Sequence, residues 1–375
     1  MVDAVQAGAI LHIDLEALVA NWRAIGASAA PAVAAAVVKA DAYGLGAVPV
    51  VRALAAAGCK HFFVAHLSEA VALEREVPAG AALYVLNGLM PGAEAACAAI
   101  GAIPVLNSLD QLERWAALGR AAGQALPAVL QVDTGMSRLG LPADELERLI
   151  AEPTLREGIE LRFVMSHLAC ADAPGHEANA LQVAAFERIC AAFPGVPRAL
   201  DNSAGALAAG RGHFDLIRPG IALYGGAPFA DRVNPMRPVV RLEARIVQLR
   251  AVAAGTGVGY GLTFTAPRET RLATLAVGYA DGWPWHLANK GSAFVGGVRV
   301  SVVGRVSMDS MTIDVTDVPA EHLYPGAPVE LIGPHQTLED VARDAGTIDY
   351  EILTRLGARY ARVYNDGGAA APDGD

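Results

Sequence analysis

Lys39 directly follows the apolar run Ala34–Val38, and Tyr43 comes four residues later, before Gly44. A lysine at the end of a buried strand keeps its stem in apolar surroundings, where desolvation lowers the pKa of the amine and favours its nucleophilic neutral form. Such an amine can form a Schiff base with a carbonyl compound. The same position also fits a lysine that only extends its ammonium group into solvent. The Tyr43 hydroxyl, which could reach a phosphate group, adds weight to the chemical interpretation.

Two later apolar runs end in groups that can bind phosphate. Ser203 follows the run Pro197–Asp201, and Gly220 and Ile221 follow the run Phe214–Ile217. Hydroxyl and backbone N–H groups after the last strands of a barrel commonly bind phosphate. Ser203 could instead be the N-cap of the next helix, and capping is compatible with phosphate binding. These positions point to a phosphorylated cofactor.

Arg218 closes the last of these runs. A buried guanidinium needs an acceptor, and a pyridine nitrogen could serve. Because arginine stays protonated, it would leave that nitrogen unprotonated and weaken the ring as an electron sink. A salt bridge to Asp215 or another acid is the alternative. His167, which ends an earlier run, either orients Arg218 or is a core histidine.

These residues belong to a pattern that repeats from residue 32 to about 224, in which a short apolar run, a turn and an amphipathic helical segment alternate. The alternation predicts an α/β fold, a (β/α)8 barrel of the TIM type. A capping box at Ser108–Gln111 marks the start of one of its helices. Function in such barrels lies at the carboxyl ends of the strands, so the polar run ends, with Arg138 beyond the fifth run, should converge on one mouth. The eight runs are Ala34–Val38, His61–His66, Leu83–Asn87, Ile103–Asn107, Ala128–Val132, Leu161–His167, Pro197–Asp201 and Phe214–Ile217.

Beyond residue 236 the helical periodicity fades and short strands separated by glycine follow, which predicts a mainly β C-terminal domain. The polar, proline-containing segment Asp231–Pro238 marks the boundary. We therefore expect a barrel domain over 1–235, whose first strand could pair with the second domain, a β domain over 236–366 and a disordered tail over 367–375. The expected strands of the β domain are Arg241–Arg250, Arg271–Val277, Ala293–Val295, Val298–Val303 and Met311–Val315.

Charge and hydropathy limit the partners of the chain. Its 375 residues carry a net charge of -10, which disfavours nucleic acid and anionic membranes. The longest apolar stretch, Ala24–Val38, is interrupted by Pro31 and is shorter than the roughly 18 to 20 residues of a membrane span. The N-terminus lacks the basic region of a signal peptide. We expect a soluble cytoplasmic protein with reduced thiols and no metal site, because its cysteines show no paired spacing: Cys59, Cys97, Cys170 and Cys190.

Seven motifs occur in a fixed order: Val38–Gly44, Val132–Gly140, Asp201–Ser203, Arg218–Gly225, Val258–Gly261, Val277–Trp283 and Val303–Asp309. With them the chain resembles the alanine racemase family over essentially its whole length, from Leu11–Leu15 to Arg359–Tyr364. The resemblance implies pyridoxal 5′-phosphate as cofactor and interconversion of L- and D-alanine. It also implies a homodimer in which the β domain of one subunit completes the active site of the other.

The same resemblance implies the roles of individual residues. Lys39 would hold the cofactor as a Schiff base and exchange the α-proton on one face, while Tyr260 of the partner subunit acts on the other. Inversion needs both, because a proton leaves from one side and arrives on the other. Tyrosine is a weak base at neutral pH, so His167 with Arg218 would support Tyr260. The implied cofactor-binding residues are Lys39, Tyr43, His167, Ser203, Arg218, Gly220 and Ile221; the implied substrate-binding residues are Arg138, Met308 and Asp309, with Tyr279 on the access path.

Two positions depart from the family pattern. Gln131 stands where many relatives carry a carbamylated lysine, so we predict no carbamate there; Gln131 can hydrogen-bond Arg138 but brings no charge. The phosphate-binding tyrosine of the C-terminal segment has no clear counterpart, because Ala358 occupies its place and Tyr360 lies two positions away.

Other functions remain open on these grounds. A racemase of serine or of broader specificity would differ from an alanine racemase by modest pocket energies. A related amino-acid decarboxylase is disfavoured by Arg218, since decarboxylation profits from a protonated ring. A non-catalytic protein that binds pyridoxal 5′-phosphate would not need a second base such as Tyr260. Whether the D-alanine serves cell-wall biosynthesis or catabolism is a further open alternative.

Overall fold

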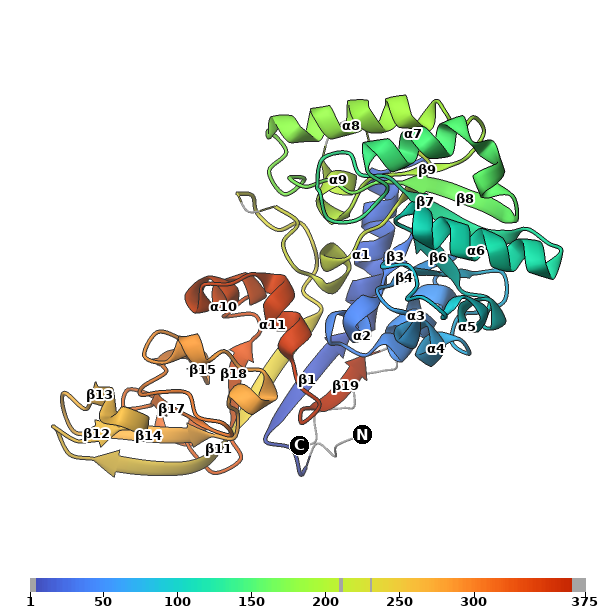
Figure 1. Ribbon diagram of the computed structural model, residues 1–375. Helices are drawn as coiled ribbons and strands as arrows, with labels where there is room; N and C mark the ends of the chain where they lie inside the picture. The colour runs from blue at the N-terminus through green and yellow to red at the C-terminus, as the bar shows by residue number, and fades with distance from the viewer. Residues whose placement is uncertain (1–4, 209–211, 230, 366–375) are drawn as a thin grey trace. The chain divides into compact units, whose positions relative to one another are not determined.

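The computed structural model describes residues 5–208, 212–229 and 231–365 (Figure 1). Contacts divide the chain into two compact units. The barrel unit comprises residues 18–223 and 227–236, and the β unit comprises the described parts of 1–17, 224–226 and 237–375. The tail expected over 367–375 lies outside the described residues. No helix in the described part of the chain is long and apolar enough to cross a membrane.

The barrel unit contains a parallel sheet that closes on itself through its first strand. Val33 and Ala34 pair with the last strand, whereas Ala36 and Val37 pair with the next one along the chain. The (β/α)8 class predicted from the sequence is confirmed. The strands, in spatial order, are β2 (Val33–Ala34), β10 (Leu216–Ile217), β9 (Arg198–Ala199), β8 (Ile159–Met165), β7 (Leu126–Gln131), β6 (Ile103–Leu106), β5 (Ala82–Val85), β4 (His61–Val64) and β3 (Ala36–Val37).

Helices alternate with these strands and surround them (Figure 1). Parallel strands covered by helices bury both faces, and the adjacent Phe62 and Phe63 of β4 are accordingly both inaccessible to solvent. Phe63 stacks on Tyr84 with ring centroids 4.6 Å apart, and Phe163 meets Tyr84 edge-on. The helices are α1 (Leu15–Ser28), α3 (Ala47–Ala56), α4 (Leu67–Leu73), α5 (Glu94–Ala99), α6 (Leu109–Ala122), α7 (Ala143–Ala151), α8 (Glu177–Cys190) and α9 (Ser203–Leu207).

The β unit is built on one eight-stranded sheet, as the predicted mainly β domain requires. Its longest strand, Val240–Val252, has an irregularity between Ile246 and Gln248 and changes partners along its length. The N-terminal strand Ala9–Asp14 lies in this sheet, antiparallel to that strand and parallel to the last one. The strands are β1 (Ala9–Asp14), β11 (Val240–Val252), β14 (Thr270–Leu275), β15 (Ser292–Val295), β16 (Val298–Ser301), β17 (Met311–Asp314), β18 (Pro328–Ile332) and β19 (Ala361–Asn365).

Two helices of the β unit are absent from the sequence-based expectation, α10 (Leu338–Ala345) and α11 (Asp349–Arg355). Thr337 caps α10 by accepting the N–H of Asp340, and Gly346 ends it in the left-handed conformation. Both signals were available in the sequence. A small hairpin of β12 (Gly257–Val258) and β13 (Phe264–Thr265) precedes β14 and surrounds Tyr260.

Candidate active site

The segment that follows β3, α2 (Lys39–Tyr43), is a turn of left-handed helix. Its residues have φ values of 53° at Ala40, 54° at Asp41, 53° at Ala42 and 56° at Tyr43. For L-residues this conformation costs about 1–2 kcal/mol each, so the surroundings must hold it. The sequence indicated only a turn beside glycine at this place.

Two carboxylates hold the turn. Glu69 of α4 accepts the N–H of Ala40 at 2.5 Å, and its other oxygen accepts those of Ala65 at 2.7 Å and His66 at 2.9 Å. Asp41 accepts the N–H of Ala47, the first residue of α3, at 2.7 Å. The sequence analysis missed Glu69, although an acid three residues after a strand end is a recognised capping pattern.

Lys39 is half-buried at the start of this turn. Burial and then the charge of Arg138 lower the pKa of the Lys39 amine, while the Glu69 carboxylate raises it. The net direction is downward, toward the neutral form that attacks a carbonyl. Lys39 therefore does not simply reach into solvent, the alternative that its position had left open.

Ser203 lies at the first position of α9, but it is not the cap of that helix. Asn202 is the N-cap and accepts the N–H of Gly205 at 3.0 Å. The buried Ser203 hydroxyl instead accepts the N–H of Gly220 at 2.8 Å and that of Ala222 at 3.3 Å. With its oxygen used as an acceptor, the hydroxyl keeps its own proton to donate.

Gly220 also approaches Tyr43 so closely that a side chain there would collide with the Tyr43 hydroxyl. Ile221 follows, buried, in a 3₁₀ turn over Ile221–Tyr224. The structure thus brings Tyr43, Ser203 and Gly220 together, from segments far apart in the sequence. The two hydroxyls can donate to a phosphate group here, whereas the Gly220 N–H is already bound to the Ser203 oxygen.

Arg218 is buried and donates from Nη2 to the carbonyls of Ser166 at 2.6 Å and Leu200 at 3.1 Å. Its Nε and Nη1 have no hydrogen-bond partner within the described residues, and Nη1 is also shielded from solvent. The alternative of a salt bridge to Asp215 is wrong, because Asp215 pairs with Arg198. Burial lowers the pKa of Arg218 to about 10, so the guanidinium remains charged at neutral pH.

His167 follows β8 at the same mouth. Burial, with Arg218, Arg138 and Lys39 nearby, lowers the pKa of His167 to about 3, so its imidazole is neutral at pH 7. No hydrogen bond links the His167 ring to Arg218 in the described part of the chain. Arg218 therefore acts on His167 only through its charge, which helps to lower the pKa of the imidazole.

Arg138 lies in an exposed loop after β7. Asp133 orders the start of this loop by accepting the N–H groups of residues 135, 136 and 137. Gln131 is buried at the end of β7, and within the residues described it makes no hydrogen bond to Arg138. The contact that the sequence analysis allowed between these two side chains is thus absent.

The β unit carries the remaining predicted residues, and they are exposed. Tyr260 is 72% exposed and Met308 is 53% exposed. Asp309 pairs with Arg359 at 2.7 Å, and Arg359 in turn holds the buried Asp281 at 2.6 Å. Arg359 thus links the residue after Met308 to a buried carboxylate. Two further aromatic residues are accessible, Tyr279 at 45% and Trp285 at 47%.

Tyr360, left unassigned by the sequence, is also in the β unit. It is buried, and its hydroxyl has no hydrogen-bond partner among the residues that the structure describes. Burial raises the pKa of the phenol, so the hydroxyl is a proton donor rather than a base.

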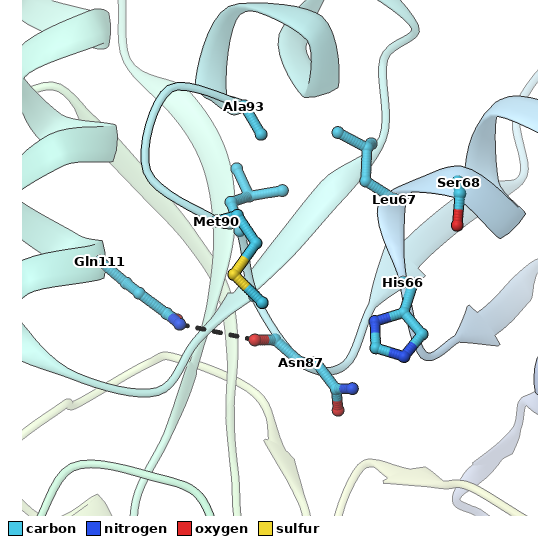
Figure 2. A pocket seen from close by; sticks show the side chains of 9 residues that line it. His66, Leu67, Ser68, Asn87, Met90, Ala93 and Gln111 are labelled. Carbon is cyan, nitrogen blue, oxygen red and sulfur yellow. Dashed lines mark hydrogen bonds between the residues drawn. The ribbon is translucent and has the colours of Figure 1, made fainter.

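A pocket of about 310 Å³ lies at the carboxyl ends of β4 and β5, next to the Glu69 turn. In Figure 2 the imidazole of His66 and the side-chain amide of Asn87 lie on one side of the pocket, with Leu67, Met90 and Ala93 on the other. The sequence analysis did not anticipate this cavity. It adds an imidazole and a side-chain amide to the barrel mouth.

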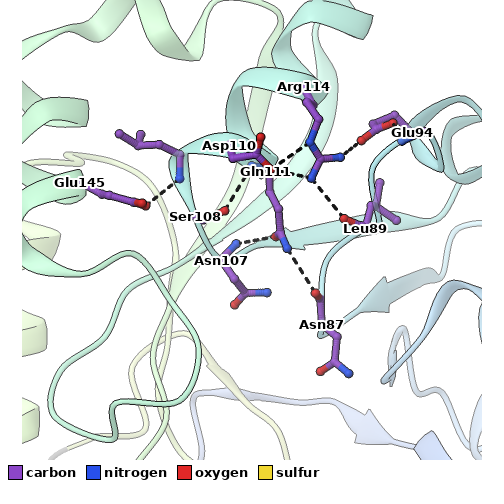
Figure 3. A network of polar contacts seen from close by, with 11 residues as sticks. Asn87, Leu89, Glu94, Asn107, Ser108, Asp110, Gln111, Arg114 and Glu145 are labelled. Atoms are coloured by element: carbon purple, nitrogen blue, oxygen red, sulfur yellow. Dashed lines mark hydrogen bonds and ion pairs between the residues drawn. The ribbon is translucent and has the colours of Figure 1, made fainter.

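Polar contacts from α6 hold the loops around this pocket (Figure 3). Gln111 donates to the carbonyl of Asn87 at 3.4 Å and accepts the N–H of Asn107 at 2.9 Å. Arg114 reaches the carbonyl of Leu89. Ser108 caps α6 as predicted, but the Gln111 side chain serves Asn107 and not Ser108, so the reciprocal capping box is incomplete.

The protein has a (β/α)8 barrel and a mainly β unit on the same chain. One mouth of the barrel holds a half-buried amine, a charged guanidinium and hydroxyl groups suited to binding a phosphate. Comparison with protein families specifies it further. Residues 13–228 match the model of the alanine racemase N-terminal domain, and residues 239–364 match that of the alanine racemase C-terminal domain. The chain therefore belongs to the alanine racemase family, whose members are isomerases.

Individual relatives agree. An alanine racemase from Brucella canis is 55% identical over 97% of this chain and 96% of its own length. A catabolic alanine racemase from Agrobacterium fabrum is 54% identical over 94% of this chain and 91% of its own. The crystal structure of alanine racemase from Bartonella henselae, with covalently bound pyridoxal phosphate, matches with a TM-score of 0.92 at 45% identity, covering 96% of this chain and 100% of that one.

Proposed function

We propose that this protein interconverts L-alanine and D-alanine with pyridoxal 5′-phosphate, bound covalently through Lys39, and with Tyr260 of the partner subunit as the second base. The proposal is supported mainly by the arrangement of side chains at the barrel mouth. There a lysine of lowered pKa begins the same turn that sets the Tyr43 hydroxyl against Gly220.

The residues present fit this cofactor. A phosphate needs donors, and the Ser203 and Tyr43 hydroxyls supply them, with the backbone N–H of Ile221 as a proposed third donor and Gly220 leaving room beside Tyr43. A pyridine nitrogen needs one donor, and Arg218 has Nε and Nη1 without partners in the described part of the chain. The unpartnered buried Nη1 is the strongest sign, because a buried polar group normally finds a partner.

When bound, the cofactor withdraws electrons from the α-carbon of the amino acid and makes its C–H acidic. The protein then has to move one proton on each face. Lys39 Nζ takes or delivers it on one face, and the Tyr260 hydroxyl does so on the other. Arg218 stays charged and keeps the ring nitrogen unprotonated, which limits side reactions of an over-stabilised carbanion.

The substrate-side residues divide between two subunits. Arg138, exposed at the barrel mouth, binds the substrate carboxylate, while the partner's Met308 and the partner's Asp309 approach from the other side. Support for a homodimer comes from the exposure of this face: Tyr260 and Leu262 are 72% and 65% exposed, which is unusual for large apolar side chains that stay in solvent. A partner barrel is the surface that would cover them.

The product, D-alanine, indicates which cellular process the enzyme would serve. We propose that the enzyme works in the cytoplasm and supplies D-alanine for the cell wall, with net catabolism of alanine as the alternative, since the Agrobacterium relative is a catabolic enzyme. Deleting the gene separates the two roles: a requirement for added D-alanine supports the biosynthetic one, and a loss only of growth on alanine supports the other.

Lys39→Ala tests the central claim. We expect the visible absorbance of the lysine-bound cofactor to disappear and racemisation to fall to background. Among the described residues no other lysine follows a barrel strand, because Lys60 precedes β4 and Lys290 lies in the β unit. Solvent deuterium incorporation at the α-carbon of each alanine enantiomer is the companion measurement. If the variant keeps both the absorbance and the exchange, the assignment of Lys39 is wrong.

A further inference from the structure

Glu69 connects two loops at the barrel mouth, the turn at Ala40, which lies 29 residues before Glu69, and the loop before α4. Its carboxylate accepts three backbone N–H groups, one from the left-handed turn at Ala40 and two from the loop before α4, at Ala65 and His66. We propose that Glu69 is a positioning residue that locks the left-handed turn and thereby fixes Lys39 relative to Tyr43. The inference rests on the proposed cofactor-binding roles of Lys39 and Tyr43.

The turn needs such a lock because its internal hydrogen bonds do not select its hand. Gly44 N–H binds the carbonyl of Ala40 at 2.8 Å, and Ala42 N–H binds that of Val38 at 2.9 Å. These bonds satisfy the middle of the turn, as they would in a right-handed helix. L-residues prefer that other hand, and contacts from outside must overcome the preference.

The position of the turn makes its hand important. Lys39 stands at its beginning, and Tyr43 ends it with the hydroxyl against Gly220. If the residues between them became right-handed or extended, Lys39 would move relative to Tyr43. The amine and the phosphate-side hydroxyl would then no longer fit one rigid cofactor, and a displacement of this size weakens both binding and catalysis.

A carboxylate suits the task better than an amide. Both oxygens of Glu69 accept hydrogen bonds, one from Ala40 and the other from Ala65 and His66. A glutamine would keep one accepting oxygen and turn an NH₂ donor toward the remaining N–H groups. Glu69→Gln therefore breaks the bridge between the two loops with almost no change in side-chain volume.

The experiment combines this variant with a glycine in the turn. Glycine adopts positive φ without strain, so Ala40→Gly should remove part of the need for the lock. Glu145→Gln is the matched control, because Glu145 accepts a single backbone N–H, that of Leu109 at 2.7 Å, in another loop of the barrel unit. Titration of each apoprotein with pyridoxal 5′-phosphate, followed by visible absorbance, gives the affinity, and kcat and KM for alanine are measured beside it.

We expect Glu69→Gln to weaken cofactor affinity about tenfold, the loss typical of a broken charged hydrogen-bond group, and to lower kcat more than it raises KM. Ala40→Gly in the Glu69→Gln background should recover part of the lost affinity, and Glu145→Gln should bind the cofactor with wild-type affinity. The inference is overturned if Glu69→Gln binds the cofactor like Glu145→Gln, or if its loss is not relieved by Ala40→Gly. Should Glu69→Gln fail to fold, the double variant decides in the same way.

Lys39→Ala distinguishes this failure from that of the proposed function. If Lys39→Ala retains the visible absorbance, the covalent role of Lys39 is wrong whatever Glu69 does. If Lys39→Ala loses the absorbance while Glu69→Gln matches its control, the proposed function stands and only the role of Glu69 is lost.

Discussion

The barrel unit and the β unit carry the two halves of the proposed site in opposite states. In the barrel, Ser203 and Arg218 are buried and hydrogen-bonded, and the strained turn at Lys39 is tied down by carboxylates. In the β unit, Tyr260 and Met308 extend into solvent. In one chain the proposed cofactor-binding residues Ser203 and Arg218 are thus held in place, whereas the proposed second base, Tyr260, is uncovered.

The difference fits the proposed homodimer. Groups that must hold a rigid cofactor profit from preorganisation, since any loosening reduces binding. A group that acts on a substrate held by another subunit needs to be accessible before association. We therefore expect cofactor binding to survive changes in the β unit that abolish turnover, and the predictions below test that separation.

Tyr260→Phe should show the largest effect. Removing the hydroxyl eliminates proton transfer on one face, for which general acid–base catalysis accounts for about 10²–10⁴-fold in rate. Cofactor affinity should not change, because the barrel holds the cofactor. Racemisation in both directions and a titration with pyridoxal 5′-phosphate measure the two quantities.

A mixture of variants sharpens this prediction. If Lys39 and Tyr260 act from different subunits, hybrids of Lys39→Ala with Tyr260→Phe contain one intact composite site and one doubly defective site. Mixing and reassociating the two inactive proteins should then restore activity. Absence of any recovery, with hybrid formation verified by differently tagged subunits, would place both bases in one subunit.

Ser203→Ala has a smaller effect and acts on the barrel half. Its loss leaves the N–H groups of Gly220 and Ala222 without their acceptor and removes a phosphate donor, at a cost of about 1–3 kcal/mol in cofactor binding. Ser108→Ala is the control, since Ser108 caps α6 and its removal should lower the free energy of unfolding by about 1 kcal/mol without altering cofactor affinity. Equal cofactor affinities in the two variants would contradict the assignment of Ser203.

The sequence predicted the barrel because its signal is repeated. Each of the eight runs overlaps a strand, and even the two-residue β10 lies in its predicted run, since hydrophobic periodicity and helix starts recur along the barrel. Lys39, Arg218 and Ser203 were found by the same logic, as the polar ends of those strands. Of the two roles left open for Ser203, that of N-cap is wrong, because the neighbouring Asn202 caps α9.

The features missed depend on tertiary contacts. The residues Ala40–Tyr43 do not predict a left-handed turn, because none of them is glycine. The hand of the turn depends on Glu69, which lies in another loop. The strand Ala9–Asp14 lies in the sheet of the β unit, a pairing that the sequence had left open for the first strand, and its partners lie more than 200 residues away. Local propensity could neither fix the hand of the turn nor decide that pairing.

The third prediction concerns His167 and pH. The imidazole is neutral in the folded barrel with a pKa of about 3, while the unfolded chain has the ordinary value of about 6.5. Between these values the unfolded chain binds more protons, so the stabilisation is complete above pH 6.5 and is lost as the pH falls toward 3. Through His167, the free energy of unfolding of the wild type should fall by up to about 1.4 kcal/mol per pH unit in this range. His167→Gln should not show this decrease.

Urea unfolding of the two apoproteins between pH 6.5 and pH 4 measures the difference. The wild-type curve should fall more steeply than that of His167→Gln, because only the wild type has to take up a proton beside Arg218 and Arg138. Parallel curves would show that the imidazole is not buried against these cations. In that event the preorganised barrel half would lack one of its charge contacts, and Tyr260 would lose the neutral neighbour proposed to support it.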